Sequence, residues 1–137
     1  MSRALTNDQR RAIRKEFKGA VNMGPKRLER WLGTKDAKRV GRKEDGNGGE
    51  SVGHRSGRRI VRILRTKSGD LTDADVRHMR KVVGYVERHR AQRPKGDVTD
   101  TAWRASLMNW GHDPLRDGRG KKRGASARLP KIPKSAA

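Results

Sequence analysis

The stretch TDADVRHMRKVVGYVERHRA, residues 72–91, decides the fold class of this chain. Thr72 and Asp75 stand three residues apart, the spacing of a capping box that begins a helix. Four apolar side chains then recur at intervals of three and four residues: Val76, Met79, Val83 and Val86. This spacing lines them up on one side of a helix. The pattern predicts an amphipathic helix that reaches about residue 91 and ends before the Arg93-Pro94 pair.

Two further helices are predicted before this one. Thr6 and Gln9 form a second capping box, and the apolar residues that follow recur every four positions, at Ile13, Phe17 and Val21. A helix over about 7–20 follows from this pattern. The next helix is expected over about 25–32, because proline suits a first helical turn and a glycine at position 33 suits the end of a helix.

Two more helices complete an all-α prediction of about five short helices. One begins after Ser56, which is expected to cap it, carries an apolar face over residues 60–64, and ends at Ser68-Gly69. The flanking arginines favour a helix over a buried strand there. The last helix carries Trp103, Leu107 and Trp110 on one face and is ended by a glycine at position 111.

The segments between and after these helices are predicted to lack regular structure. Residues 41–57 contain six glycines mixed with charges, which predicts a long mobile loop. From Arg116 onward, eight lysines and arginines stand against the single acid Asp117 in a stretch rich in small residues and proline. We expect residues 116–137 to form a disordered basic tail, because they cannot bury enough apolar surface to offset the entropy of ordering.

Composition sets the size of the folded part. Leu, Ile, Val and Phe together make up 22 of the 137 residues, and the formal net charge is +21. Such a chain cannot build a large hydrophobic core, so a single small helical domain is expected over residues 1–115. A homodimer would fit the same composition, because pairing two chains buries apolar faces that one chain cannot cover.

Several classes of protein are excluded by what the sequence lacks. There is no cysteine, hence no disulfide framework and no thiolate zinc site. No apolar run approaches the roughly 20 residues that a membrane span needs, and the first residues lack the apolar core of a signal peptide. The expected location is the cytoplasm, in association with the bacterial nucleoid.

Four strings carry a resemblance to a known family. They are VNMGPKRLERWL (21–32), SVGHRSGRRIVRIL (51–64), HMRKVVGYVERHRAQRP (78–94) and WRASLMNWGHDP (103–114). In this order they resemble an uncharacterised microbial family of small proteins that are often labelled only as DNA-binding. The resemblance implies a DNA-binding role without a mechanism, and it supplies no catalytic residue.

Basic residues on the helices are the main candidate binding groups. Near the helix predicted over 72–91, Glu87 is the one acidic residue among the many basic residues between Arg77 and Arg93. A charged helix face is often merely solvated. A cluster of positive charges, however, favours binding to the phosphates of a duplex, because bound counterions are released. The candidates for nucleic-acid binding are Arg55, Arg58, Arg62, Arg77, Arg80, Lys81 and Arg88, with Lys121, Lys122 and Arg123 in the tail. Gly84, on the same side, would allow a phosphate backbone or another helix to approach closely, and helix packing is the commoner cause.

Other patterns are weaker. Residues 53–58 lead into the start of the predicted helix, where a phosphate could bind, although simple capping by Ser56 is the favoured interpretation. His78 and His89 lie too far apart on one helix to share a metal ion, and His112-Asp113 has no nucleophile motif beside it. No metal site, cofactor or enzymatic activity is therefore predicted.

The aromatic residues are predicted to serve packing first. Trp31, Trp103 and Trp110 could stack on exposed bases, but their helical phase with leucines favours the core. Tyr85 shares a stripe with His78 and His89 and would border either the core or a partner.

The leading functional hypothesis is a small protein that binds duplex DNA mainly through phosphates, without sequence-specific readout. Two alternatives remain open at this point. The same charge would serve an RNA-associated or ribosome-associated protein. A protein-interaction module with no direct nucleic-acid role would instead use Trp31, Tyr85 or Trp110 as partly exposed anchors.

Overall fold

The structure is a computed structural model that describes residues 4–41, 49–116 and 128–133. These residues form six α-helices and two short 3-10 turns, and they contain no β-strand, which confirms the all-α prediction. The helices are α1 (Asn7–Ala20), α2 (Pro25–Leu32), α3 (Lys35–Arg39), α4 (Val52–Leu64), α5 (Asp73–Arg90) and α6 (Ala102–Asn109). The 3-10 turns are η1 (Ser68–Asp70) and η2 (Pro114–Arg116).

Both capping boxes are confirmed. The Thr6 side chain accepts from the Gln9 N–H, and Gln9 accepts in return from the Thr6 N–H, so two of the backbone donors at the start of α1 are satisfied. Thr72 and Asp75 make the same reciprocal pair at the start of α5. At the other end of the chain, Gly111 follows α6 with a φ of 85°, a left-handed conformation that favours glycine.

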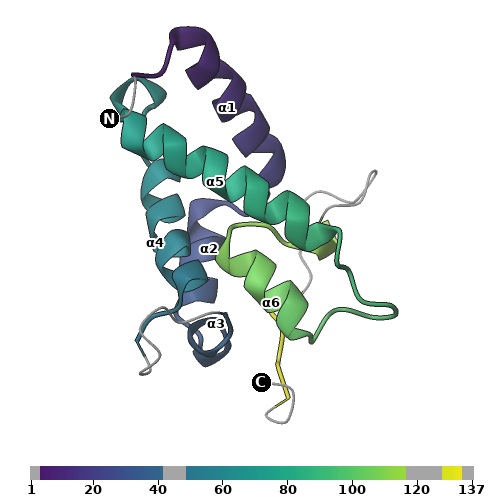
Figure 1. The fold of residues 1–137 in the computed structure, drawn as a ribbon. Helices are drawn as coiled ribbons and strands as arrows, with labels where there is room; N and C mark the ends of the chain where they lie inside the picture. Colours follow the sequence, from purple (N-terminus) through teal and green to yellow (C-terminus); the bar gives the residue numbers. More distant parts are fainter. Residues whose placement is uncertain (1–3, 42–48, 117–127, 134–137) are drawn as a thin grey trace.

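Helices α1 and α5 pack against each other along one side of the molecule (Figure 1). Their N-terminal ends are joined through Asp73, which accepts the Leu5 N–H at 3.0 Å and pairs with Arg10. Arg10 also donates to the Leu71 carbonyl at 2.5 Å. These contacts fix the direction of α1 along α5, so that its stripe of Ile13 and Phe17 is buried.

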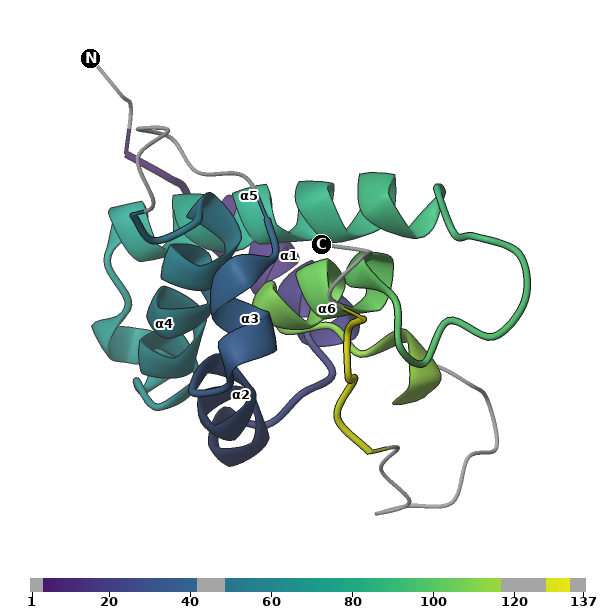
Figure 2. The same ribbon diagram turned by 90° about the horizontal axis from the view of Figure 1, so that it is seen from below.

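The other four helices form a second group, seen on one side of α5 in Figure 2. Helix α2 packs against α4, and α6 contacts α2, α3, α4 and α5. Asn109, at the end of α6, connects them: its side-chain oxygen accepts from the Trp31 indole N–H at 2.8 Å, and its amide donates to the Ala37 carbonyl at 3.0 Å. Buried polar groups are costly unless paired, so this residue fixes one relative position of α2, α3 and α6.

The core is small and draws on residue types beyond the aliphatic ones. Trp31, Met23 and Met108 are among its largest fully buried side chains. Trp110 is buried as well, so the core assignment is confirmed for Trp31 and Trp110, whereas Trp103 is only partly buried. The sequence-based count of Leu, Ile, Val and Phe therefore understates what this chain can bury.

The predicted loop over residues 41–57 is wrong at its C-terminal end. Helix α4 begins at Val52, so Gly53 and Gly57 are helical. A Cβ at Gly53 would lie 2.9 Å from the Trp110 indole nitrogen, and one at Gly57 would lie 2.5 Å from the Asn109 carbonyl oxygen. These glycines therefore permit close packing of α4 on the end of α6. Residues 42–48 lie outside the described part of the chain.

Ser56 does not cap α4. Residues 53–58 lie within α4 and do not lead into its start, contrary to the prediction. Ser51 is the cap instead, since its hydroxyl accepts from the His54 N–H at 3.1 Å. Helix α3 was not predicted at all, because its five residues carry no apolar periodicity.

Part of the predicted disordered tail lies against the folded domain. Asp100 accepts both the Arg128 side chain and the Lys131 N–H, and Asp36 accepts the Ile132 N–H at 3.2 Å. Ile132 is buried in the core. For residues 128–133 the prediction of disorder is therefore wrong, because two carboxylates and a buried isoleucine hold the segment. Residues 117–127 and 134–137 lie outside the described part, and the boundary at residue 115 stays a prediction.

Candidate nucleic-acid interface

A cleft of about 380 Å³ lies where α4, α5 and α6 meet. Helix α5 contributes two cations and one hydroxyl to its wall, from Lys81, Arg88 and Tyr85, and α6 contributes the hydroxyl of Ser106. The remaining wall is uncharged and consists of Gly41, Val52, Gly53 and Trp110. The cleft thus combines an apolar wall with side chains that can donate hydrogen bonds to an anion.

A second cavity of about 220 Å³ adjoins the first, since Val52, Lys81 and Trp110 line both. It adds two arginines from α4, Arg55 and Arg59, together with two residues that contact each other, Ser56 and His78. No Asp or Glu is among the described residues that line either cavity. Because they share these lining residues, we describe the two cavities as one groove, and the charged groups among its described lining residues are all cationic.

A ladder of stacked rings runs beside the groove, and Tyr85, Trp110 and His78 of this ladder line it. The ring centroids of Tyr85 and Trp110 lie 4.3 Å apart, with an angle of 14° between their planes. His78 stacks on Trp110 at 6.3 Å and His89 stacks on Tyr85 at 5.1 Å. Trp103 continues the ladder beyond His89, at 5.9 Å, and also carries the Arg93 guanidinium 5.5 Å from its ring centroid. The rings therefore cover one another, and Tyr85 borders both the core and the cleft.

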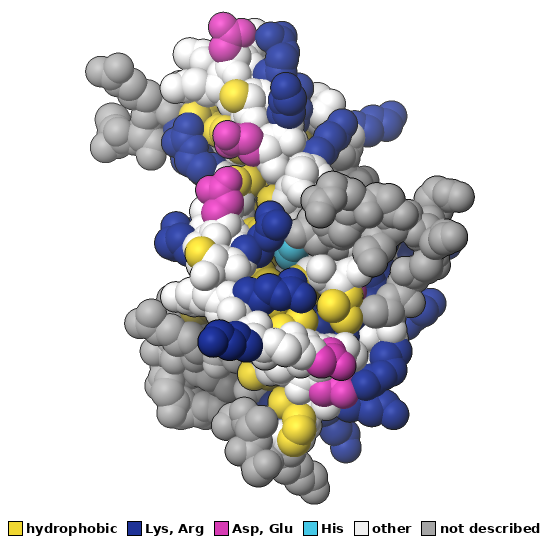
Figure 3. Space-filling model, turned by 90° about the vertical axis from the view of Figure 1, so that its right-hand side faces the viewer, with side chains coloured by type: hydrophobic (Ala, Val, Ile, Leu, Met, Phe, Trp, Pro, Cys, Tyr) yellow, Lys and Arg dark blue, Asp and Glu magenta, His cyan; other side chains and the backbone are white. Residues whose placement is uncertain are grey.

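Three of the predicted binding residues have no ion pair within the described part of the chain. They are Arg80, Lys81 and Arg88, all on α5, and all three are exposed. Lys81 and Arg88 line the cleft, while Arg80 does not. Figure 3 shows Lys and Arg side chains spread over one face of the molecule, with acidic side chains between some of them.

The other predicted residues are partly compensated. Arg58 pairs with Glu50 through two hydrogen bonds of 2.6 and 2.7 Å. Those bonds, helped by His54, lower the pKa of Glu50 to about 2. Arg62 lies 2.8 Å from Asp75, and Arg77 acts electrostatically on Asp73. The predicted tail residues Lys121, Lys122 and Arg123 lie outside the described residues.

The pKa of the buried Asp75 reflects its hydrogen bonds with two arginines of α4. Burial by itself raises the pKa of Asp75, but hydrogen bonds from Arg62, the Thr72 N–H and Arg59 outweigh burial, so the net pKa lies well below the ordinary value. Asp75 forms ion pairs with Arg59 and Arg62 and partly neutralises their charge. By contrast, the groove cations of α5, Lys81 and Arg88, form no ion pair with a described carboxylate.

Sequence reasoning missed Arg59 and Ser106. Arg59 follows Arg55 by four residues, so the helical spacing places both on one side of α4 and could have identified it. Ser106 has no such signal, because its place in the cleft depends on how α6 packs against α5. Gly84 lies beside Arg88: a Cβ there would lie 3.1 Å from the Arg88 guanidinium, and the three nearest atoms all belong to Arg88. Helix packing therefore does not explain this glycine.

Residues 16–108 match the model of a family described as a protein of unknown function, DUF3140. The chain belongs to the DUF3140 family. This confirms the resemblance to an uncharacterised family, while the family description assigns no DNA-binding role, so that role stays a prediction. No curated protein and no solved structure matches the chain.

The match covers most of the groove in this DUF3140 chain, because α4 and α5 lie entirely within it. Among the described residues, no helix is long and apolar enough to cross a membrane. In the same part of the chain, no three or more acidic or histidine side chains gather as metal ligands would.

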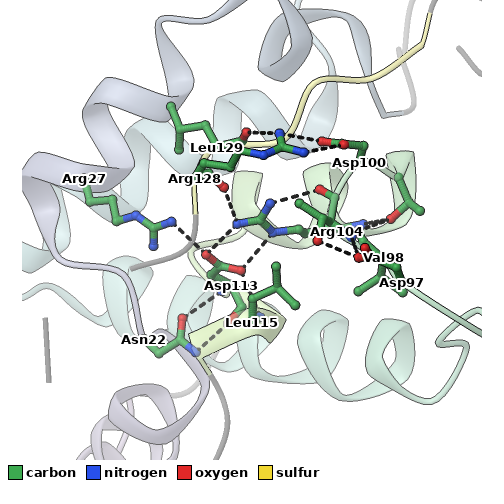
Figure 4. Close-up of polar contacts among 12 residues, drawn as sticks. Asn22, Arg27, Asp97, Val98, Asp100, Arg104, Asp113, Leu115, Arg128 and Leu129 are labelled. Atoms are coloured by element: carbon green, nitrogen blue, oxygen red, sulfur yellow. Dashed lines mark hydrogen bonds and ion pairs between the residues drawn. The ribbon is translucent and has the colours of Figure 1, made fainter. Parts of the chain in front are cut away.

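A buried ion-pair network lies next to α6, on the side shown in Figure 4. Arg104 and Asp113 are both fully buried and share two hydrogen bonds of 3.0 and 3.1 Å. Arg27 from α2 also pairs with Asp113, at 2.8 Å, and Arg104 donates to the Arg128 carbonyl at 2.9 Å. The pair therefore holds α2, α6 and the C-terminal segment together. His112 has a different role from its neighbour, since its Nδ1 contacts the Ala20 carbonyl at 2.7 Å.

His78, which lines the groove, is expected to make the stability of this DUF3140 fold depend on pH. Burial, with help from the nearby charge of Arg59, lowers its pKa from 6.5 to about 4. In the unfolded chain His78 is protonated as the pH falls below about 6.5, whereas in the folded chain it stays neutral until about pH 4. Stability is therefore expected to fall as pH falls through that window.

We expect the replacement His78→Gln to reduce this loss of stability. Urea unfolding at pH 7 and pH 5 measures the free energy of unfolding in both proteins, and the difference between the two pH values is smaller in the variant. Glu50 and Asp100, whose pKa values are about 2 when folded, lose their contribution below about pH 4.5 and do not affect this comparison. Burial also lowers the pKa of His89, so a smaller slope remains. An equal pH dependence in the two proteins would contradict the assignment to His78.

Proposed function

We propose that this chain binds duplex DNA through its phosphates, with Lys81 and Arg88 of α5 and Arg55 of α4 as the central contacts. The observation that carries the proposal is the composition of the groove. Four cations from two helices line it, and no described acidic residue does. A phosphate backbone rewards such an arrangement through release of bound counterions.

The unpaired cations on α5 support the same function. Lys81 and Arg88 make no ion pair with any described carboxylate, so binding to phosphates does not require an existing interaction to be broken. The net charge of +21 adds a long-range attraction to any polyanion. Arg58 and Arg62, which already pair with Glu50 and Asp75, are expected to contribute less.

The aromatic residues favour contact with phosphates over stacking with bases. Single-strand binding proteins need ring faces on which bases can stack. Trp31 is fully buried, and Trp110 lies between His78 and Tyr85 in the ladder. Tyr85 in turn lies between Trp110 and His89. With these faces covered, we infer binding that does not read the base sequence, as would suit a protein on the bacterial nucleoid.

The double variant Lys81→Ala and Arg88→Ala is expected to bind duplex DNA at least about tenfold more weakly, since two phosphate contacts are lost. Fluorescence anisotropy of a mixed-sequence duplex, measured with the full chain from 50 to 300 mM salt, tests this. The slope of log affinity against log salt is expected to fall by about 1.8, or about 0.9 for each phosphate contact.

The matched control removes two arginines that already have acidic partners, in the double variant Arg11→Ala and Arg65→Ala. Arg11 pairs with Asp8, and Arg65 pairs with Glu29 at 3.0 Å. Its net charge changes by the same amount, but its affinity is expected to stay within about twofold of the original. Equal losses in the two variants, or no binding at 50 mM salt, would show the proposal to be wrong. A structured RNA that binds more tightly than the duplex at matched salt would assign the surface to RNA instead.

A further inference from the structure

We propose that the cleft between α4, α5 and α6 is a binding site for a phosphate monoester of nucleotide size, whose phosphate contacts Lys81, Arg88, Tyr85 and Ser106. This site goes beyond the proposed duplex binding, because it takes a terminal phosphate with its attached organic group and not the diester backbone. Either function can hold without the other.

Four side chains that line the cleft can donate hydrogen bonds: Lys81, Tyr85, Arg88 and Ser106. Lysine and arginine supply charge-assisted hydrogen bonds to phosphate oxygens, and the two hydroxyls supply neutral ones. Burial raises the pKa of Tyr85, an effect larger than the opposing one from the nearby Arg88 charge, so the phenol keeps its proton. The hydroxyl is therefore available as a donor at neutral pH.

Gly84 leaves room beside the Arg88 side chain. The guanidinium nitrogen lies 3.1 Å from the place where a Cβ of residue 84 would stand. The absence of a side chain at Gly84 thus lets the guanidinium lie against α5 beside the cleft. No described carboxylate pairs with Arg88, and no acidic side chain of the described residues lines the cleft. The charge therefore remains available for an anionic ligand.

The size of the cleft indicates more than a bare phosphate ion. Its volume of about 380 Å³ falls within the range of about 300–1,000 Å³ that small-molecule sites occupy. Val52, Gly53 and Trp110 form an uncharged part of the lining, with Trp110 stacked beside Tyr85. The ligand expected from this lining carries a phosphate for the donors and an organic group for the uncharged residues. Such a phosphate monoester occurs in free nucleotides and at the 5′ ends of DNA strands.

Calorimetric titration of the full chain with 5′-dAMP tests the site, with deoxyadenosine as the ligand that lacks the phosphate. We expect saturable binding of dAMP at one site and none of deoxyadenosine. Arg88→Ala is expected to weaken dAMP binding at least about tenfold, as for the loss of a charge-assisted hydrogen bond. Tyr85→Phe and Ser106→Ala are expected to weaken it by smaller factors. The matched control is Arg30→Ala, which removes an exposed cation of α2 outside the cleft and is expected to leave dAMP binding unchanged.

Two hairpin duplexes, one with a 5′-phosphate and one with a 5′-hydroxyl, identify the source of the ligand. Tighter binding of the phosphorylated hairpin, with a preference that is smaller in Tyr85→Phe, supports a strand end as the ligand. Binding of dAMP with no preference between the hairpins supports a free nucleotide. If dAMP does not saturate and the two hairpins bind equally, the proposal is overturned, even where both hairpins bind well as duplexes. An equal loss of dAMP binding in Arg30→Ala and Arg88→Ala would overturn it too, because general charge would then account for the binding.

Discussion

The replacement Asp113→Asn is expected to lower the free energy of unfolding by about 3–5 kcal/mol, because it leaves the Arg104 cation buried without its counterion. Both side chains are fully excluded from solvent. Burial alone raises the pKa of Asp113, yet hydrogen bonds from Arg104 and the charge of Arg104 reverse that effect, so its net pKa is lowered. The carboxylate is therefore charged in the folded protein, and Asn cannot replace that charge.

The loss is large relative to the total stability of a small domain, which is typically about 5–15 kcal/mol. Asp113 also accepts the Leu115 N–H at 3.0 Å and pairs with Arg27, so several elements depend on it. Urea unfolding followed by circular dichroism measures the change. Asp8→Asn is the matched control, because Asp8 pairs with Arg11 on the surface and both side chains are mostly exposed. Its stability is expected to be nearly unchanged. Similar losses in the two variants would contradict a special role for the buried pair.

Local signals in the sequence were sufficient for α1 and α5, which each begin with a capping box and carry an apolar stripe. The Thr6–Gln9 and Thr72–Asp75 boxes predicted the starts of α1 and α5, and the structure places both helices there. These signals are local, since a cap and a stripe involve residues within a few positions of one another. Helix α3 has a cap at Thr34, but its five residues are too few to show periodicity.

The candidate site was predictable only in part. The charges of Lys81 and Arg88 are evident from the sequence, whereas their convergence with Ser106 depends on the packing of α6 against α5. Ion pairs across the fold, such as that of Arg62 with Asp75, also decide which cations stay free. Composition cannot reveal those pairs, because the partners lie far apart in the sequence. The contacts of Asp100 with Arg128 and Lys131 were not predicted either, because these residues also lie far from Asp100 in the sequence.

The glycines of α4 illustrate how composition misled the prediction. A glycine-rich segment is usually flexible, because glycine loses the most conformational entropy on folding. Gly53 and Gly57 are nevertheless helical, and both face the end of α6 at distances that exclude any side chain. The cost of placing glycine in a helix is offset here by close packing. That packing leads to a direct test.

The replacement Gly57→Ala is expected to destabilise the protein by about 2–3 kcal/mol, in the upper part of the range for overpacked cores. The added Cβ would lie 2.5 Å from the Asn109 carbonyl oxygen and 2.7 Å from a Leu32 methyl carbon. A leucine side chain can shift, but the carbonyl belongs to the backbone at the end of α6. Movement of that backbone would disturb Asn109, whose side chain joins α2, α3 and α6.

Gly19→Ala provides the matched control, since Gly19 is also helical and a Cβ there would have no atom within 4 Å. Alanine is favoured over glycine in a helix by about 0.5–1 kcal/mol, so this variant is expected to gain stability. Urea unfolding of the two variants should therefore give changes of opposite sign. If Gly57→Ala stabilises the protein as Gly19→Ala does, α4 does not pack on the end of α6 as closely as the structure indicates.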